Sequence, residues 1–442
     1  MAPLIRSFVA RRGTRTPREA KQAGEMRDLL PRWSTSVGPS RRGCVRHPLV
    51  LRATAAARPR GLLMHTPRSV PFAAPDIHAD DVDAVTQVLA SGWITSGSEC
   101  MALEAELADY LTVDHVVAMS SCTAALDTAV AFLDLPPGAA VGVPTWTFVS
   151  TALAAVHAGL VPVLLDVDPN TLNLDLASLD RAIADGLDAV IGVHFGGLPL
   201  DRSVHERCAD AGIPLVEDGA HALGAHDHRG TLAGQGTAGA CFSFYATKNL
   251  TSGEGGALAT DDERLAEFAR SFRLHGLSKD AWSRYGPDAP HGYDLLAPGI
   301  KGNLPDLLAA LARSQLHRFD ATQASRRHLV QHYRKGLDGC AIRFVPDDLV
   351  EGSADHLVVV ILPEGVSRDA VVSHLSAAGI ATSVHFQPLH TFGWFREHAK
   401  VGAGGAPTAD ALAPRALSLP LHTRLTDDDV AYVCDTLRGA LA

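Results

Sequence analysis

The stretch "HVVAMSSCTAALDTAVAFLDL", residues 115–135, joins a short apolar run to a helical pattern through a turn of small residues. The run at 115–119 has the length and composition of a buried strand, and apolar residues then recur at helical spacing. The same alternation continues as far as Asp218, with further strands at "AAVGVPT", "VPVLLDVD", "DAVIGVHF" and "IPLVED". Strands that alternate with helices predict an α/β fold, in which helices cover both faces of a mostly parallel sheet.

Segments on both sides extend this core. Two helices at 76–92 and 99–112 are predicted to form an N-terminal arm. Two strands at 239–246 and 256–261 follow the core, and a helix at 262–276 comes after them. The pattern indicates one large domain built around a single sheet.

The rest of the chain predicts a smaller α/β unit. A long helix is expected from Asp306 to about Arg334, and strands are expected at "HLVVVILP" and "ATSVHFQPL". The last helix begins at Thr426, with Asp429 at the spacing of a capping box. We therefore expect three parts: a basic segment at 1–63, a large domain at 64–318 and a small C-terminal domain at 319–442.

Composition and charge limit the function classes. The chain has 442 residues, of which 46% are hydrophobic and 20% charged, and it contains no apolar run long enough to span a membrane. Its seven cysteines show no spacing typical of a metal site, so we expect reduced thiols, no metal and a cytoplasmic location. The net charge after residue 63 is −21, which argues against nucleic acid as a partner.

The first 63 residues differ from the rest because they hold fourteen basic and three acidic residues. They are rich in Arg, Pro, Gly and Ser and show no sustained period, which is typical of disorder. The segment also fits a nucleic-acid-binding arm or an organellar transit peptide. We favour a simpler interpretation, in which translation starts at Met64 and the segment is not part of the protein.

Four strand ends carry candidate functional residues, and the carboxyl ends of strands are where ligands bind in α/β sheets. The turn from Ser120 to Thr123 opens directly into a helix, so its free N–H groups suit a phosphate or carboxylate, although it also fits an ordinary N-cap. Asp218 ends a buried strand, where a carboxylate needs a cationic partner unless it only caps the next turn.

The two other strand ends carry a lysine and an aromatic pair. The stretch "CFSFYATKNLTSGEGG", residues 241–256, sets Lys248 among small residues, where desolvation lowers the pKa of an amine and makes it a nucleophile towards carbonyls. Its glycines allow the backbone to approach a flat ring. Trp146 and Phe148 follow another strand, where one ring is able to stack on a planar cofactor, or both belong to the core. Together these parts match the needs of pyridoxal phosphate.

At these residues the sequence resembles the DegT/StrS-type nucleotide-sugar aminotransferases, and among them the branch that acts on 4-keto sugars, including the enzyme for UDP-4-amino-4-deoxy-arabinose. The resemblance covers residues 70–441 and rests on ordered motifs: "SGWITSG", "SSCTAAL", "PTWTFVST", "VEDGAHALGA", "FSFYATKNLTSGEGG", "HGLSKDAW", "PGIKGNLPD", "HFQPLH" and "SLPL". It implies the aspartate-aminotransferase fold, with a pyridoxal-phosphate-dependent transfer of an amino group from an amino acid, glutamate being expected, to a nucleotide-linked keto sugar.

The resemblance also implies roles for individual residues. Lys248 is implied to form the Schiff base, Asp218 to pair with the pyridinium and His221 to lie near the phenolic oxygen of the cofactor. Phe148 aligns with the ring-stacking aromatic, and His385 with a stretch that lines the sugar site. The phosphate is implied to be held by Thr123, Ala124, Ser243 and, from the neighbouring subunit of a homodimer with shared active sites, Asn303.

Three positions depart from the family pattern, and three other functions stay open. Phe148 replaces a Trp of the arabinose branch, so Trp146 stays an alternative, while Gly302 and Pro305 replace an aromatic and a hydroxyl residue, which alters the expected loop around Asn303. The alternatives are a keto-cyclitol aminotransferase, a sugar dehydratase and a regulator with an aminotransferase-like domain. The dehydratase branch has His at the position of Lys248, and the regulator needs a DNA-binding head that residues 1–63 do not resemble.

Overall fold

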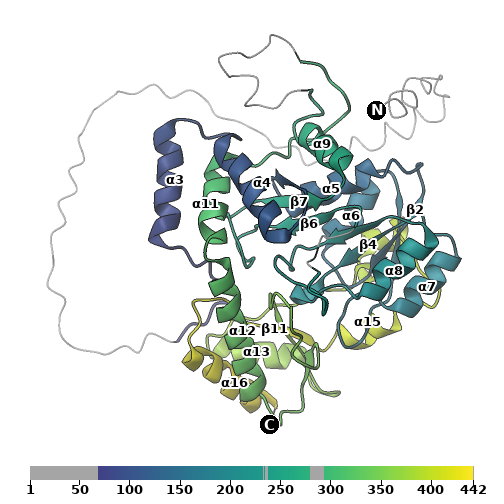
Figure 1. The fold of residues 1–442 in the computed structure, drawn as a ribbon. Coiled ribbons are helices and arrows are strands. Elements are labelled where there is room, and N and C mark those ends of the chain that lie inside the picture. Colours follow the sequence, from purple (N-terminus) through teal and green to yellow (C-terminus); the bar gives the residue numbers. More distant parts are fainter. Residues whose placement is uncertain (1–67, 232, 234–236, 279–292, 442) are drawn as a thin grey trace, which may run out of the picture. The chain divides into compact units, whose positions relative to one another are not determined.

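The computed structural model describes residues 68–231, 233, 237–278 and 293–441, so the basic segment at 1–63 lies outside the described residues. An eight-stranded sheet forms the larger layer, in the order β1-β7-β6-β5-β4-β2-β3-β10 (Figure 1). Its strands are β1 (His115–Met119), β2 (Ala140–Pro144), β3 (Val161–Leu165), β4 (Ala189–Val193), β5 (Leu215–Asp218), β6 (Ala240–Ser243), β7 (Gly256–Thr260) and β10 (Lys400–Val401).

The sheet is mostly parallel, as predicted. Only β7 runs against its neighbours, pairing with β1 and β6, while the register pairs Val193 with Asp218 between the parallel strands β4 and β5. All five residues of β4 are buried, which is typical of a strand with helices on both faces. The strand ends that carry the candidate residues are therefore brought to one edge of the sheet.

Helices cover both faces of this sheet. One face packs its apolar side chains against α5 (Cys122–Phe132), α6 (Val149–His157) and α9 (Glu263–Phe272). The opposite face packs against four helices: α4 (Ser98–Leu111), α7 (Leu176–Ala184), α8 (Arg202–Ala211) and α11 (Asp306–Leu316). The helix α3 (Ala79–Ser91) lies beside α11 at the margin of the fold (Figure 1). The prediction of an α/β fold with a covered sheet is confirmed.

A second, antiparallel sheet has the order β11-β9-β8 and lies in the C-terminal part, where a smaller α/β unit was predicted. Its strands are β8 (Arg343–Val345), β9 (Val358–Ile361) and β11 (Ala416–Leu419), and its helices include α12 (Phe319–Gly336), α13 (Arg368–Ala377) and α16 (Asp427–Leu441). The capping box is present, because Thr426 Oγ1 accepts from Asp429 N and Thr426 N donates to the Asp429 carboxylate.

Two predicted elements were wrong. The segment 381–389 forms a single bridge, from Ser383 to Ser418, instead of a strand. Pro388 has no N–H to donate, and Trp146 Nε1 donates to the carbonyl of His385, so this backbone is bonded to the large sheet's loops instead. The long helix expected from Asp306 is broken between α11 and α12. Arg318 lies at this break as the N-cap residue of α12, and its guanidinium binds the Asp81 carboxylate.

The C-terminal part returns once to the large sheet before it ends. The strand β10 pairs with β3 in parallel, and the amides of Thr408 and Ala409 donate to the Asp166 carboxylate at 2.9 and 3.0 Å. These amides begin α15 (Pro407–Leu412), so a carboxylate from the large-sheet region caps this helix. None of the helices in the described ranges is both long and apolar enough to cross a membrane.

Candidate active site

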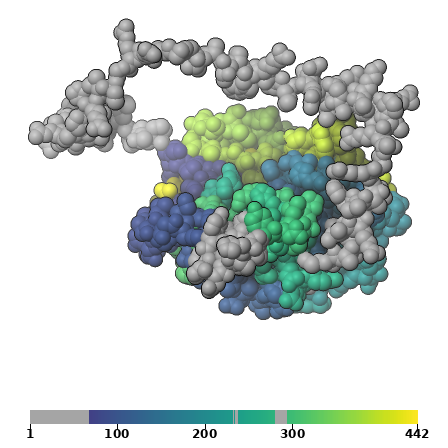
Figure 2. Space-filling view, turned by 90° about the horizontal axis from the view of Figure 1, so that it is seen from above, coloured from purple at the N-terminus to yellow at the C-terminus, as the bar shows by residue number. Residues whose placement is uncertain are grey.

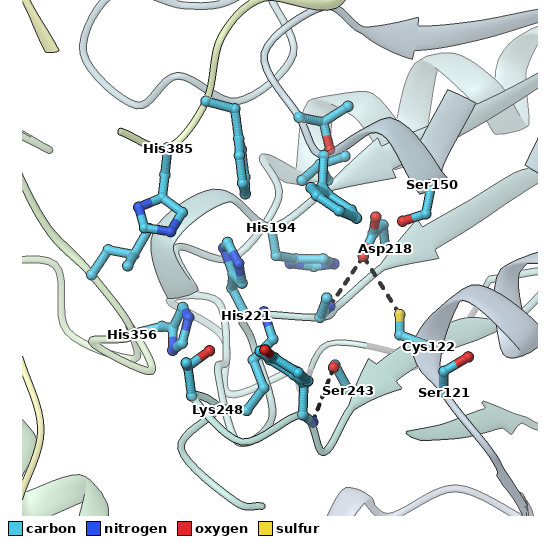
Figure 3. Close-up of a pocket in the computed structure, with 18 of the residues that line it drawn as sticks. Ser121, Cys122, Ser150, His194, Asp218, His221, Ser243, Lys248, His356 and His385 are labelled. Carbon is cyan, nitrogen blue, oxygen red and sulfur yellow. Dashed lines mark hydrogen bonds between the residues drawn. The ribbon is translucent and has the colours of Figure 1, made fainter. Parts of the chain in front are cut away.

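A cavity of about 390 Å³ lies at the carboxyl ends of the large-sheet strands (Figure 3). The turns after β1, β2, β4, β5 and β6 form its walls, together with residues from the C-terminal part of the chain. Seven of the predicted site residues line it: Thr123, Phe148, Asp218, His221, Ser243, Lys248 and His385. Ala124 and Asn303 do not line this cavity.

Lys248 lies beyond the end of β6, where its amide donates to the carbonyl of Tyr245 at 2.9 Å. Burial lowers the pKa of its ammonium from 10.5 to about 8, against the opposing influence of Cys122 and Asp218. Loss of hydration destabilises the charged form and thus favours the neutral amine. At slightly alkaline pH a large fraction of this lysine is therefore a free nucleophile.

Asp218 is 5% exposed at the end of β5 and has only neutral hydrogen-bond donors. Its carboxylate accepts from Thr151 Oγ1 at 2.7 Å and from the amide of Ala220 at 3.1 Å. Among the described residues, no Lys, Arg or His nitrogen lies within 4.0 Å of it. Because a buried carboxylate is stabilised by a cationic partner, this arrangement fits the protonated ring nitrogen of pyridoxal phosphate.

The turn before α5 offers the features of an anion site. Ser121 is the N-cap and its Oγ accepts from the amide of Ala124 at 3.1 Å, while Cys122 and Thr123 line the cavity. The Ala124 amide therefore has to exchange this partner before it binds a phosphate. A Cβ on Gly256 would lie 2.5 Å from the Cys122 nitrogen, so this glycine permits contact with the turn rather than with a flat ring.

Three histidines line the same cavity as the lysine: His221, His356 and His385 (Figure 3). Burial, followed by the charge of Lys248 and the neighbouring histidines, lowers the pKa of His221 and His356 well below 6.5, and that of His385 to about 4. All three are neutral at pH 7. His221 Nδ1 accepts from the amide of Gly196 at 3.2 Å, which leaves its Nε2 to carry the proton and act as a donor.

Trp146 and Phe148, which the sequence left as alternatives for the ring-stacking residue, differ in exposure. Trp146 is fully buried and its Nε1 donates to the carbonyl of His385 at 3.0 Å. Phe148 is 56% exposed and lines the cavity, with its ring 6.0 Å from that of Phe386. Phe148 is therefore the ring available for stacking, and Trp146 is part of the structure that positions His385.

The sequence did not reveal the importance of His356 and Thr151. His356 begins the run "HLVVVILP", where it is indistinguishable from any strand residue, yet its ring lies 4.3 Å from that of His221. Its Nδ1 is 2.9 Å from Asn249 Oδ1, and Asn249 Nδ2 donates to Gln323 and Ala354, so His356 Nδ1 carries the proton. Thr151 lies within a quoted motif, but its contact with Asp218 required the fold.

Glu217 is buried on the opposite side of β5 from Asp218, between His194 and His205. Burial alone would raise its pKa, but the two histidines outweigh burial and bring it from 4.5 to about 2. The pKa of His205 is raised above 6.5, because its bond to Glu217 outweighs desolvation. The carboxylate thus stabilises the fold above pH 4.5, and the imidazolium does so below pH 6.5.

We expect Glu217→Gln to destabilise the protein most between about pH 4.5 and 6.5, by about 3 kcal/mol. The difference should shrink as the pH falls towards 2 and as it rises through the pKa of His205. Denaturant unfolding of both proteins across this pH range measures it. Asp180→Asn, which removes the exposed partner of Arg207, is the control and should leave the pH dependence unchanged. A pH-independent effect of Glu217→Gln would contradict the prediction.

Known proteins resemble this chain over most of its length. A model of the DegT/DnrJ/EryC1/StrS aminotransferase family matches residues 75–438. The spore coat polysaccharide biosynthesis protein SpsC of Bacillus subtilis is 38% identical over 377 residues, which cover 84% of this chain and 96% of SpsC.

Solved structures of aminotransferases also match most of this chain. Spr1654 from Streptococcus pneumoniae in its PMP-form has a TM-score of 0.78 and 31% identity, covering 84% of this chain and 99% of its own. Its PLP-form has a TM-score of 0.77 at 29% identity, covering 84% and 98%. DesI, solved in the presence of its TDP-sugar product, has a TM-score of 0.74 at 30% identity, covering 84% and 92%.

Proposed function

Because the chain belongs to the DegT/DnrJ/EryC1/StrS aminotransferase family and is a pyridoxal-phosphate-dependent transaminase, we propose that it transfers an amino group from glutamate to the C4 keto group of a nucleotide-linked sugar. The product would serve an amino-sugar-containing glycan, lipopolysaccharide or secondary metabolite. The observation that carries the proposal is a buried, desolvated Lys248 that shares one cavity with Asp218, a buried carboxylate bonded only to neutral donors.

The cavity residues fit the cofactor part by part. Asp218 would bind the ring nitrogen, Phe148 would stack on the ring and His221 Nε2–H would donate to the phenolic oxygen. Lys248 would hold the cofactor covalently. The phosphate would lie at the start of α5, near Thr123, Ser243 and, after exchange of its present partner, the Ala124 amide.

The protein's own groups would carry out acid–base work. When bound, pyridoxal phosphate supplies an electron sink for the pair released by the breaking C–H bond and carries the amino group between the substrates. Lys248 Nζ takes the proton from the α-carbon of the donor and holds it for return, which a group of pKa about 8 does in either direction. Asp218 would stabilise positive charge on the ring nitrogen, and the neutral histidines would add no charge to the site.

The sugar would bind on the side of His385, whose Nδ1 is 3.0 Å from Ser418 Oγ. The neutral state of His385 leaves it able to bind a sugar hydroxyl. DesI, a relative of 30% identity, was solved with a TDP-sugar product, which supports a nucleotide-linked acceptor. The choice of C4 and of the 4-keto branch rests on the motifs of the sequence.

Product analysis tests this proposal directly. The protein loaded with pyridoxal phosphate is incubated with glutamate or glutamine and with UDP- or TDP-linked 4-keto sugars, 3-keto sugars or a keto-inositol. We expect a nucleotide 4-amino sugar and 2-oxoglutarate in equal amounts, identified by mass spectrometry and NMR. Amination of the keto-inositol alone would establish the cyclitol alternative, while loss of a sugar hydroxyl without amination would establish a dehydratase.

Phe148 tests the stacking role. We expect Phe148→Ala to weaken the binding of pyridoxal phosphate about tenfold, because an aromatic contact contributes about 0.5–1.5 kcal/mol beyond area burial. Phe148→Trp should retain or improve binding, since the arabinose branch has Trp at this position. Titration of the protein with cofactor, followed by absorbance, measures both constants. Equal affinity of the wild type and the alanine variant would exclude Phe148 as the stacking ring.

We further propose that the enzyme is a cytoplasmic homodimer with shared active sites. Asn303 lies outside the cavity of its own chain, and its Nδ2 donates to Ser96 Oγ at 2.7 Å. The neighbouring arm exposes large apolar side chains just before α3, along α3, in the loop after it and on α4, namely Ile77, Val82, Leu89, Ile94 and Met101. The helix α3 projects at one edge of the described residues (Figure 2), which suits a surface that a second copy covers.

Mixing two inactive variants tests the shared site. Lys248→Ala removes the amine, and Asn303→Asp places a repelling charge where the partner's phosphate would bind. If each active site uses both chains, reassorted mixtures regain about a quarter of wild-type activity, since half the dimers are mixed and each has one intact site. Activity that stays absent in dimers shown to be mixed would contradict a shared site. Size measurement of the wild type gives the dimer itself.

The proposed division into domains at 64–318 and 319–442 is supported by the break between α11 and α12. The helix α11 packs on α3 and α4, whereas α12 packs on α16. The return of β10 to the large sheet is the exception to this division.

A further inference from the structure

A second cavity, of about 180 Å³, meets the first one at Lys248. Both cavities are lined by Ala73, Thr247 and Lys248, and no other residue is common to them. The second cavity is called the rear shaft here. It runs between the segment 73–78, the loop after Lys248 and the junction of α11 with α12. Its outer residues, Ala321 and Ser325, are exposed, whereas Gln315 and His422 at its inner end are 7% and 5% exposed.

Two residues that line the rear shaft, Gln315 and His422, each have a buried polar atom without a hydrogen-bond partner in the described part of the chain. Gln315 Oε1 accepts from the amide of Thr251 at 3.0 Å, which leaves the Nε2 donors unused. His422 Nε2 lies 3.2 Å from the carbonyl of Pro71 and therefore carries the proton, which leaves Nδ1 as an unused acceptor. The lining of the shaft therefore has one donor that lacks an acceptor, Gln315 Nε2, and one acceptor that lacks a donor, His422 Nδ1.

Water meets both needs, since it donates and accepts at once. Buried polar atoms without protein partners are commonly bonded to ordered water, and the volume has room for several molecules. The hydroxyls of Thr322, Ser325 and Thr423 extend the polar lining, and Thr423 Oγ1 donates to the Asp76 carboxylate at 2.9 Å. An apolar ligand would leave Gln315 Nε2 and His422 Nδ1 unpaired.

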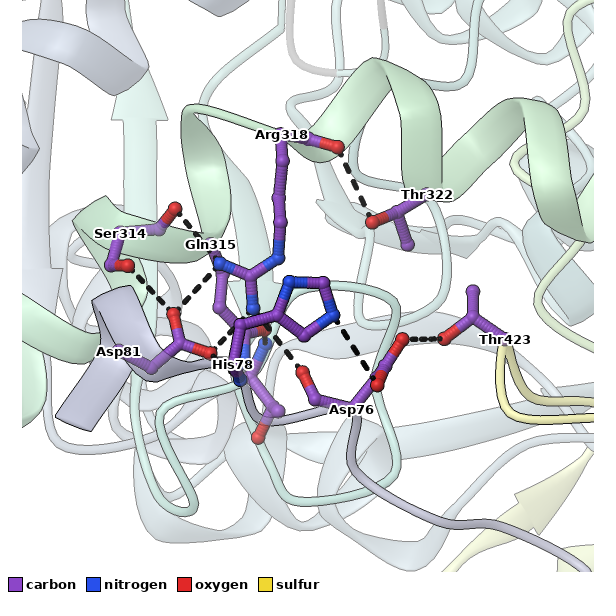
Figure 4. A network of polar contacts seen from close by, with 9 residues as sticks. Asp76, His78, Asp81, Ser314, Gln315, Arg318, Thr322 and Thr423 are labelled. Carbon is purple, nitrogen blue, oxygen red and sulfur yellow. Dashed lines mark hydrogen bonds and ion pairs between the residues drawn. The ribbon is translucent and has the colours of Figure 1, made fainter.

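The walls of the rear shaft are held in place by an ion-pair network (Figure 4). Arg318 donates to both oxygens of Asp81 and to the carbonyl of Asp76 at 3.2 Å. Ser314 Oγ also donates to Asp81, at 2.6 Å, and the His78 amide donates to it at 2.9 Å. These bonds fix the arm at 76–81 against the junction of α11 with α12, so the shaft does not depend on a mobile side chain.

We propose that the rear shaft is a water-filled proton route that connects Lys248 with solvent while cofactor and substrate fill the front cavity. The proposal rests on the proposed role of Lys248. After the amine has taken the α-proton of the donor, the ammonium exchanges hydrogen with a shaft water: with an α-deuterated donor, Nζ–D and H₂O become Nζ–H and HDO. The lysine then returns a solvent proton instead of the original one.

Isotope retention tests the route. The protein loaded with pyridoxal phosphate reacts with α-deuterated glutamate in H₂O for one half-reaction, and mass spectrometry measures the deuterium kept on the cofactor. Without exchange, retention approaches about a third, because an ammonium has three equivalent hydrogens. We expect wild type to retain less than about a tenth of that limit. Ala321→Leu, which fills the outer shaft, should raise retention towards the limit.

Ala324→Leu is the matched control, since Ala324 is exposed on the same helix and does not line the shaft. It should behave as wild type, and thermal unfolding checks that both variants are folded. Equal retention in wild type and Ala321→Leu overturns the shaft as the exchange route, as does wild-type retention near a third. If glutamate fails to alter the visible spectrum of the wild type, the result contradicts the proposed function and not the shaft.

A crystal structure of the loaded wild type tests the shaft without any turnover. We expect an ordered water within hydrogen-bonding distance of Gln315 Nε2, and a chain of waters from there to His422 Nδ1 and Lys248 Nζ. An anion or a repacked side chain in this volume would overturn the proposal.

Discussion

Lys248→Ala will lack the visible absorption band of the cofactor-loaded wild type and will lose transaminase activity by about 10⁴-fold or more. In the proposed mechanism this lysine is both the group that would hold the cofactor covalently and the group that would move the proton. Burial lowers the pKa of this lysine to about 8, and Lys248→Arg cannot restore function, because a guanidinium stays protonated. The measurements are the absorption spectrum before and after glutamate and the rate of amino-sugar formation.

A matched control is Lys335→Ala, at an exposed position of α12, which should keep the band and its response to glutamate. An unchanged band in Lys248→Ala would mean that another amine holds the cofactor, and the assignment of the site would be wrong. Loss of the band with normal turnover would separate covalent attachment from proton transfer and would contradict the single-lysine mechanism.

Asp218→Asn is expected to lower the turnover number by about 10² to 10⁴-fold while leaving the KM for the sugar within a few-fold. The amide retains the shape of the carboxylate but loses the charge. Thr151 and Ala220 donate to different carboxylate oxygens, so the single amide oxygen keeps the bond from the Ala220 amide, and the Thr151 hydroxyl then has to accept from the new NH₂ group. Removal of one partner from a buried ion pair costs about 3–5 kcal/mol. In the proposed site that cost would fall on the protonated ring of the cofactor, whose charge would draw electrons from the substrate.

Steady-state kinetics and the cofactor dissociation constant check this result. Thr151→Val is the graded comparison, because it removes a single 2.7 Å bond to the same carboxylate, and about a tenfold effect is expected. If Asp218→Asn retained wild-type turnover, the carboxylate would serve only to shape the turn after β5.

Local patterns in the sequence were sufficient for much of the fold. The alternation from residue 115 to Asp218 is a property of neighbouring residues, and it gave the mostly parallel sheet and its covering helices. Because ligands bind at strand ends in such sheets, Asp218 and Lys248 were predicted to share a site, and both line one cavity. The segment 381–389 had the composition of a strand, but its hydrogen bonds depend on Trp146 and other distant groups, which no local pattern reports.

The missed residues share a similar cause. His356 lies more than a hundred residues after Lys248 in the sequence, and only the packing of the small sheet against the large one brings its ring next to His221. At the break between α11 and α12, Arg318 pairs with Asp81, which is far from it in the chain. Contacts between distant residues are set by the topology of the fold. The periodicity of a sequence indicates only which face of a helix or strand is buried, and not which residues it will contact.

The return of β10 to the large sheet limits how this protein can be recombined with its relatives. The chain leaves the large sheet after β7, builds β8 and β9, rejoins the large sheet at β10 and Asp166, and leaves it again for β11. A chimera with one crossover near residue 318 would pair a foreign β10 with the native β3 and a foreign α15 with the native cap. Exchange of substrate specificity by domain shuffling therefore requires at least three junctions, and single-junction hybrids should be poorly soluble.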